Sequence, residues 1–118
     1  MAKRIRREGI EARARQVVLH VAGALGLAAD GIVRSGGRKE TAGRRIVFYV
    51  LHSACGLSLG QTALALGVDR STVAIACKAI EDRRDDPDFD EWMSALERSA
   101  AAAPAPAEPG IATAAGVR

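Results

Sequence analysis

Apolar residues recur at intervals of three and four along most of the chain, which is the spacing of one face of an α-helix. Residues 5–27 carry the clearest stripe: Ile10, Ala14, Val17, Val18, Val21, Ala22 and Leu25. Runs rich in Val, Ile and Thr with strict alternation, the pattern of a half-buried strand, are absent. The pattern therefore predicts an all-α fold whose first helix spans residues 5–27 and stops near Gly26.

Four further helices are expected after this one. Residues 27–33 suit a short turn of helix, and residues 34–40 are predicted to form a basic loop, because adjacent glycines break helices. The helices are expected at residues 41–55 (Thr41 as N-cap, Gly56 as stop), at 59–66, from Asp69 or Ser71 to about Arg84, and at 88–100. The chain is thus expected to fold as a compact bundle of about five helices.

The last predicted helix and the segment after it indicate where the folded domain ends. One stripe of the last helix contains Phe89, Trp92, Met93 and Leu96. Aromatics make up only 3% of the chain, and a domain with so few needs them for burial, so we expect this stripe to cover the core. Three prolines within six residues follow, in a stretch too poor in large apolar groups to order itself. We expect an N-terminal basic helix and connector (1–33), a DNA-binding domain (34–100) and a disordered Ala/Pro-rich tail (101–118).

Residues 59–78 match the spacing of a helix-turn-helix. That motif needs a small residue where its helices cross, a glycine at the turn and an apolar anchor on the second helix. Ala63, Gly67 and Val73 supply these at offsets of four and six. The pattern favours DNA binding, and a helical hairpin that serves packing alone is the alternative.

Charge and polar side chains extend this interpretation. Residues 1–57 hold eleven Lys/Arg against four acids, whereas residues 58–118 hold six against ten. A basic first half suits a phosphate-binding surface, although a solvated arginine-rich face would have the same composition. At the start of the second motif helix, Arg70 can donate to guanine, Asp69 can accept from cytosine, and Ser71 or Thr72 can contact bases or phosphates. The alternative is that Asp69 and Ser71 only cap the helix.

Other chemistry has little support in the sequence. His20 and His52 lie in apolar helical surroundings without ligands at metal spacing, so we expect satisfied structural histidines and no enzyme. Cys55 and Cys77 form neither a disulfide framework nor a zinc site, and no cofactor is predicted. No stretch approaches the roughly 20 apolar residues of a membrane span. A cytoplasmic, nucleoid-associated protein is expected.

Residues 34–98 resemble the C-terminal DNA-binding domain (domain IV) of the bacterial replication initiator DnaA. The resemblance lies in the basic segment 34–39, in Arg44-Arg45, in Ser58-Leu59 and in residues 68–81, VDRSTVAIACKAIE. It implies that Arg38 and Lys39 enter the minor groove, that Asp69 to Thr72 read the major groove, and that Ser58, Leu59 and Gly60 touch DNA. Arg70 replaces a usual histidine and Gly60 a frequent proline. The candidate DNA-binding residues are Arg34, Arg38, Lys39, Arg44, Arg45, Ser58, Leu59, Gly60, Asp69, Arg70, Ser71 and Thr72.

The resemblance also implies a function. The chain contains no Gly-x-x-x-x-Gly-Lys-Ser/Thr loop for nucleotide, so we expect a DnaA-like domain without ATPase activity. Such domains resemble transcriptional regulators, including activators of gene transfer agent clusters, and imply recruitment of RNA polymerase or a sigma-factor-like partner. One alternative is a replication regulator that competes for the initiator's sites. Another is a helical protein-interaction adaptor that docks through Phe89, Trp92 and Met93.

Overall fold

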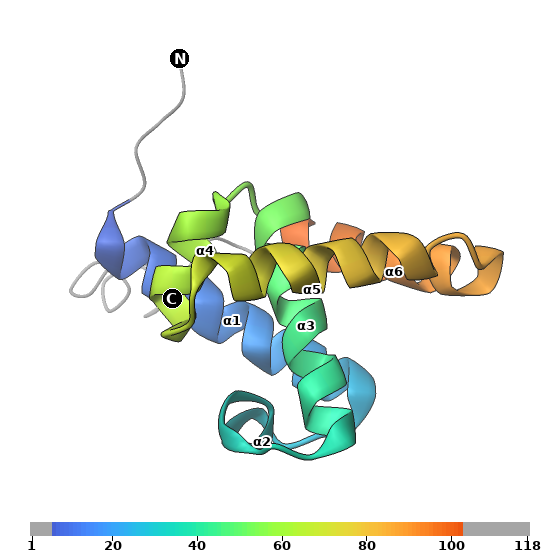
Figure 1. The fold of residues 1–118 in the computed structure, drawn as a ribbon, viewed down its shortest axis with the longest axis horizontal. Helices are drawn as coiled ribbons and strands as arrows, with labels where there is room; N and C mark the ends of the chain where they lie inside the picture. Colours follow the sequence, from blue (N-terminus) through green and yellow to red (C-terminus); the bar gives the residue numbers. More distant parts are fainter. Residues whose placement is uncertain (1–5, 103–118) are drawn as a thin grey trace, which may run out of the picture.

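The structure, a computed structural model, describes residues 6–102 of the 118-residue chain. Within this range it contains six helices and no strand: α1 (Arg7–Leu25), α2 (Ala29–Arg34), α3 (Arg38–Ser53), α4 (Leu59–Leu66), α5 (Arg70–Arg83) and α6 (Pro87–Ala102) (Figure 1). The expected all-α bundle is confirmed. The helix beyond the expected five is α2, in the segment where a short turn of helix was predicted.

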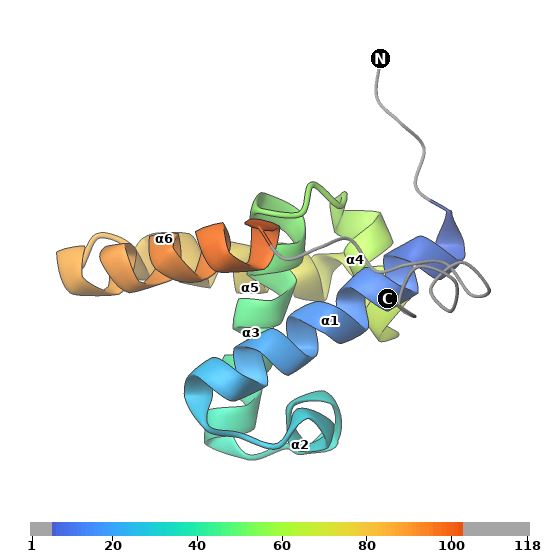
Figure 2. The ribbon, with the colours of Figure 1, turned by 180° about the vertical axis from the view of Figure 1, so that it is seen from behind.

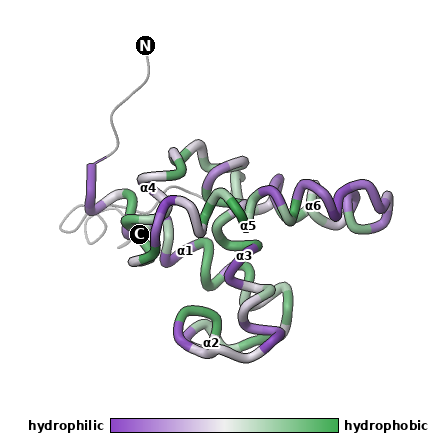
Figure 3. The backbone as a smooth tube through the Cα atoms, viewed as in Figure 1, coloured by the Kyte–Doolittle hydropathy of each residue, from purple (hydrophilic) through white to green (hydrophobic). Residues whose placement is uncertain are grey.

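Helix α3 forms the centre of the fold and packs against each of the other five helices (Figure 1). Its residues from Ile46 to Leu51 are all buried, as expected for a helix covered on every side. Figure 3 shows hydrophobic stretches where the helices cross and a hydrophilic end at the turn between α5 and α6. The buried α3 therefore fixes the positions of the five helices packed around it.

Helix α1 lies across α3 and also contacts α4 and α6 (Figure 2). The stripe predicted from Ile10 to Ala22 is buried, and Gly26 ends the helix with φ +69°, a conformation that glycine adopts without a Cβ clash. The buried residues of α1 belong to the same hydrophobic core as those of α3, α5 and α6. Residues on both sides of position 34 thus share one core.

The expected basic loop at residues 34–40 is wrong in its extent. Arg34 ends α2, and Arg38 and Lys39 lie in the first turn of α3, so only residues 35–37 connect the two helices. The N-cap of α3 is Gly37, not Thr41. The physical reason is that Arg, Lys and Glu directly after the glycines are good helix formers, so the helix begins as soon as the glycines end.

The end of α3 also differs from the prediction. The helix stops at Ser53, with Ala54 at the C-cap position, and Gly56 lies in the turn that follows. The Leu57 N–H donates to the Leu51 carbonyl in this turn (3.0 Å), and Leu57 is buried. The turn brings the chain directly to the start of α4.

Helix α6 closes the core, as predicted. Pro87 occupies its first turn, where a missing N–H costs nothing, and the Asp86 carboxylate accepts from the Asp88 N–H (2.9 Å). Met93 and Leu96 are buried, whereas Phe89 and Trp92 are half-buried against the core with ring centroids 6.0 Å apart. Residues 101 and 102 belong to α6, and the rest of the expected disordered tail lies outside the described residues. None of the described helices has the length and apolar character needed to cross a membrane.

A polar network, not anticipated from the sequence, ties the α5–α6 turn to α3. Arg84 donates to Asp90 (2.6 Å), Glu97 (2.9 Å), the Tyr49 hydroxyl (3.1 Å) and the Ser94 hydroxyl (2.7 Å). The hydrogen bonds to Asp90, Glu97 and Tyr49 hold the pKa of Arg84 above its usual value. This arginine therefore fixes the direction in which the chain leaves α5.

Candidate nucleic-acid interface

Helices α4 and α5 form the helix-turn-helix that the spacing predicted. Ser58 and Gln61 make a reciprocal capping box at the start of α4: the Ser58 hydroxyl accepts from the Gln61 N–H (3.0 Å), and the Gln61 side chain accepts from the Ser58 N–H (2.8 Å). Gly67 ends α4 with φ +69°, and Ala63 and Val73 are buried at the helix crossing. Each of the three motif positions thus has the environment that the motif requires.

The first turn of α5 faces solvent. Asp69 occupies the N-cap position, but its carboxylate accepts no hydrogen bond from the helix, and Ser71 lies inside the helix. The side chains of Asp69, Arg70, Ser71 and Thr72 are all exposed. The alternative that Asp69 and Ser71 serve only as caps therefore finds no support in the hydrogen bonds of this turn.

The end of α2, the middle of α3 and the start of α5 converge on two neighbouring depressions. Arg34, Arg44 and Thr72 line the first, together with residues of the α4–α5 turn. Arg44 and Thr72 also line the second, with Arg45 and Ile75. Residues that are almost 40 positions apart in the sequence thus meet beside the first turn of α5.

The arginines around these depressions are engaged to different degrees. The Arg44 guanidinium donates to the backbone carbonyls of Ile32 (2.7 Å) and Ser35 (3.2 Å), so it satisfies the carboxyl end of α2. Arg34 pairs with Asp30 (2.9 Å), and both side chains are largely exposed. Arg38 and Arg45 are exposed, and neither has a side-chain partner within residues 6–102. Arg44 is a structural residue in the free protein, whereas Arg38 and Arg45 are available to a ligand.

Lys39 does not join this group. It lines a separate depression with Arg83, Phe89 and Trp92, formed by the end of α5 and the start of α6. Consecutive residues of a helix point about 100° apart, so placing Arg38 and Lys39 in α3 separates two side chains that a flexible loop would have kept together.

Ser58, Leu59 and Gly60 lie at the end of α4 that is farther from the turn. The Ser58 hydroxyl belongs to the capping box, Leu59 is half-buried, and Gly60 is exposed. None of the three lines the depressions beside α5. Their contact with DNA stays a prediction from the resemblance.

Ile75, which is absent from the predicted set of DNA-binding residues, also lines one of these depressions. It is 69% exposed, lies one helical turn after Ser71 on the outward face of α5, and lines a depression with Arg45 and Thr72. A signal existed in the sequence, because Ile75 falls outside the inward stripe of Val73, Ala76, Cys77 and Ile80.

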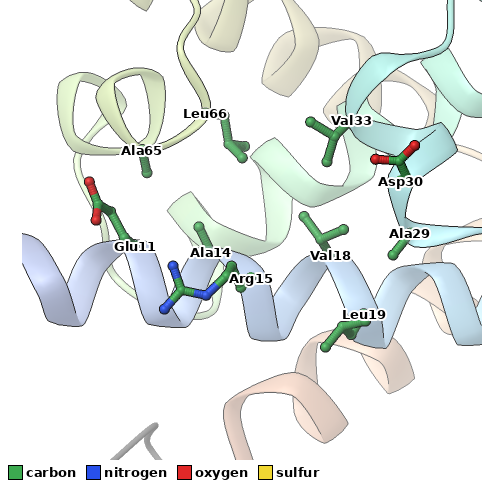
Figure 4. A pocket seen from close by; sticks show the side chains of 10 residues that line it. All are labelled: Glu11, Ala14, Arg15, Val18, Leu19, Ala29, Asp30, Val33, Ala65 and Leu66. Atoms are coloured by element: carbon green, nitrogen blue, oxygen red, sulfur yellow. The ribbon is translucent and has the colours of Figure 1, made fainter. Parts of the chain in front are cut away.

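An apolar groove adjoins the first depression (Figure 4). Val18, Val33 and Leu66 point toward its centre from α1, α2 and α4 and also line the depression beside Arg34. Asp30, the ion-pair partner of Arg34, lies at the rim of the groove. The surface beside the motif is therefore continuous from apolar to basic.

The other candidate groups have structural surroundings. His20 Nε2 lies 2.6 Å from the Ser99 hydroxyl, and His52 Nδ1 lies 2.8 Å from the Leu57 carbonyl. Burial raises the pKa of the Cys55 and Cys77 thiols. Within residues 6–102, no group of three or more His, Cys, Asp or Glu side chains could hold a metal ion.

This geometry defines a helical helix-turn-helix domain with a solvent-facing second helix. The same fold occurs in two solved structures: a DNA replication initiation factor (TM-score 0.73), and the replication initiator DnaA bound to AMPPCP and single-stranded DNA (TM-score 0.71). Each is 23% identical to the chain and covers 80% of it, while the chain spans 30% and 29% of their respective lengths. No family model and no curated protein matches the chain. The fold is that of DnaA domain IV, and the likeness extends beyond residues 34–98 because these are too few to supply 80% of the chain.

Proposed function

We propose that this chain binds double-stranded DNA sequence-specifically, with the first turn of α5 in the major groove. The observation that supports this is the exposed set Asp69, Arg70, Ser71 and Thr72 at the start of α5, the second helix of the helix-turn-helix. A guanidinium can bond bidentately to guanine and a carboxylate can accept from cytosine, and the hydroxyls reach bases or phosphates. The buried anchor Val73 fixes the angle of α5 to the rest of the domain.

The basic ends of α2 and α3 would hold the DNA backbone beside this helix. Arg45 and Arg38 lie seven residues apart on α3, about two helical turns, and therefore on one side of it. Arg45 shares its depression with Thr72, so phosphates flanking the α5 contacts would lie within its reach, and Arg38 would enter the adjacent minor groove. Arg34 would exchange Asp30 for a phosphate, and Arg44 would act by holding α2. Ser58, Leu59 and Gly60 would touch the backbone on the other flank, and Lys39 would contribute only long-range attraction.

In the cell, this binding would serve transcriptional regulation. We propose an activator, located on the nucleoid in the cytoplasm, that recruits RNA polymerase or a sigma-factor-like partner, as regulators with similar domains do. The fold shared with replication initiators favours a second candidate, a replication regulator that competes for initiator sites. Both candidates require the same DNA-binding surface and differ in where on the chromosome it acts.

Selection from randomised duplexes followed by fluorescence anisotropy tests the binding. The full chain is expected to enrich a defined sequence and to lose affinity steeply with rising salt, since phosphate contacts release counterions. Arg70→Ala should weaken binding to the selected site by about 5- to 150-fold, the equivalent of about 1–3 kcal/mol, and should relax specificity there. Arg98→Ala, an exposed arginine of α6, is the matched control and should bind as the unaltered chain does.

The outcomes separate the elements of the proposal. No enrichment, together with salt-independent affinity, would overturn DNA binding and favour the adaptor. An equal loss by Arg70→Ala on selected and random duplexes would make Arg70 a phosphate contact. Chromatin immunoprecipitation beside the cell's own initiator then decides between the two roles: peaks at promoters support the regulator, and peaks at the origin and initiator sites support the competitor.

A further inference from the structure

Ile75 exposes a large apolar side chain on α5, one helical turn beyond the proposed DNA-reading residue Ser71. Its exposed fraction, 69%, is the highest among the large hydrophobic residues that the structure leaves exposed, and the others, Leu19, Val33 and Leu64, lie on α1, α2 and α4. Among these exposed side chains Ile75 alone lies on α5. An isolated exposed isoleucine is ordinary on a protein surface, but this one stands among groups placed for polar contacts.

The position of Ile75 on the helix matches that of a base contact. It follows Ser71 by four residues, so the two side chains share one face of α5 and are displaced by about 6 Å along its axis. Base pairs in a duplex are stacked about 3.4 Å apart. A helix that places Ser71 at one base pair therefore carries Ile75 within about two base-pair steps of it.

The major groove offers an isoleucine one apolar partner among the base edges. Guanine, cytosine and adenine present hydrogen-bonding groups there, and only thymine presents a methyl group. Placing Ile75 against the other edges would remove water from polar atoms without replacing their hydrogen bonds. Arg45 and Thr72, which line the same depression, would fix the DNA close enough for van der Waals contact.

We infer that Ile75 contacts the C5-methyl group of a thymine, and that this contact makes the protein select thymine at one position of its site. This inference rests on the proposed function, because it needs α5 in the major groove. It adds a specific requirement: recognition at that position uses the methyl group and no hydrogen bond.

Exchange of single thymines for uracil in the selected duplex tests this, since uracil pairs with adenine identically and lacks only the methyl group. For the unaltered chain, one exchange, within about two base pairs of the position that Arg70→Ala relaxes, should weaken binding about fourfold, the value of one buried methyl group. Ile75→Ala should bind the thymine duplex more weakly and should not distinguish it from the uracil duplex. Leu19→Ala, which removes a similarly exposed side chain from α1, should keep the full fourfold ratio.

Two results would overturn the inference while DNA binding stands. One is that no single thymine-to-uracil exchange weakens binding of the unaltered chain, an experiment that requires no protein variant. The other is that Ile75→Ala retains the thymine-to-uracil ratio of the unaltered chain. If the unaltered chain binds no duplex, the proposed function fails first and the inference fails with it.

Discussion

Replacing Arg84 with methionine is expected to destabilise the fold without altering the DNA-reading face. Methionine keeps much of the apolar stem but removes four hydrogen-bond donations, to Asp90, Glu97, Tyr49 and Ser94. These partners lie on α3 and α6, whereas Arg84 follows the end of α5 that is opposite to the proposed base contacts. The perturbation therefore separates stability from recognition.

The magnitude follows from the exposure of each partner. Asp90 is 49% exposed, so its ion pair contributes little, within about 1 kcal/mol. Glu97 is 20% exposed and Arg84 16%, and a hydrogen bond between charged groups in such a site contributes about 1.5–3 kcal/mol. The neutral hydroxyls add less, and Ser53 still donates to Glu97 after the change (2.6 Å). A loss of about 2–4 kcal/mol in the free energy of unfolding is expected.

Urea unfolding followed by far-ultraviolet circular dichroism measures this loss, and the fluorescence of Trp92, the only tryptophan, reports on α6 directly. Arg98→Met, at an exposed position of the same helix, should change the unfolding free energy by less than about 0.5 kcal/mol. A double-mutant cycle with Glu97→Gln should give a coupling of about 1 kcal/mol or more. If Arg84→Met is as stable as Arg98→Met, the network does not hold the α5–α6 turn.

Three further predictions concern single positions. Burial, and after it the hydrogen bond to the Glu81 carboxylate, raises the pKa of Tyr49 from 10.0 to about 12. The folded state therefore holds the phenolic proton more tightly than the unfolded chain does. The resulting stabilisation of the fold is complete below pH 10 and declines by about 3 kcal/mol as the pH rises through 12. Tyr49 is the only tyrosine, so phenolate absorbance follows it alone, and a folded-state midpoint near 10 would contradict the burial argument. Gly67→Ala should lower the unfolding free energy by about 1–2 kcal/mol, because the φ of Gly67 is +69° and no neighbouring atom adds a clash. The control Gly23→Ala, inside α1, should not lower it. If urea unfolding shows the same loss for both variants, Gly67 does not adopt a left-handed conformation. Arg44→Ala should lower the unfolding free energy by about 1–2 kcal/mol, whereas Arg45→Ala should leave it unchanged and weaken duplex binding; the reverse pattern would exchange their assigned roles.

The sequence predicted the helix-turn-helix because each of its requirements is local. The capping serine, the turn glycine and the apolar anchor act within a few residues of one another, and α4 occupies the predicted residues 59–66. Periodicity located the core stripe of α1 for the same reason. The position of the first turn of α5 follows from the turn glycine and the apolar anchor, so the base-reading candidates could also be predicted from local spacing.

The features that the sequence did not predict depend on contacts between residues far apart in the chain. Two glycines and a run of charges suggested a loop at residues 34–40, and nothing in the spacing indicates that Arg44 would hold the carboxyl end of α2 close to the start of α3. The same early start of α3 turns Lys39 away from the other basic residues. The Arg84 network spans 35 positions from Tyr49, and its partners stand at no recognisable spacing. The sequence places Ile75 outside the inward stripe of α5, but only the fold shows that it lines a depression with Arg45 and Thr72.

The position of α5 explains how the acidic second half of the sequence can coexist with a DNA-binding surface. Residues 81–91 contain seven acidic residues and two arginines, and they lie around the α5–α6 turn, at the opposite end of α5 from Arg70. Fourteen helical residues separate these ends by roughly 21 Å. This exceeds the Debye length of about 8 Å at physiological ionic strength, so the acidic end hardly weakens the attraction of phosphates to Arg70. At longer range, before contact and at lower salt, the same separation acts as a dipole that turns the basic end toward DNA. The acidic turn thus favours the productive orientation, and the stability of that turn depends on Arg84, which lies at the opposite end of α5 from Arg70.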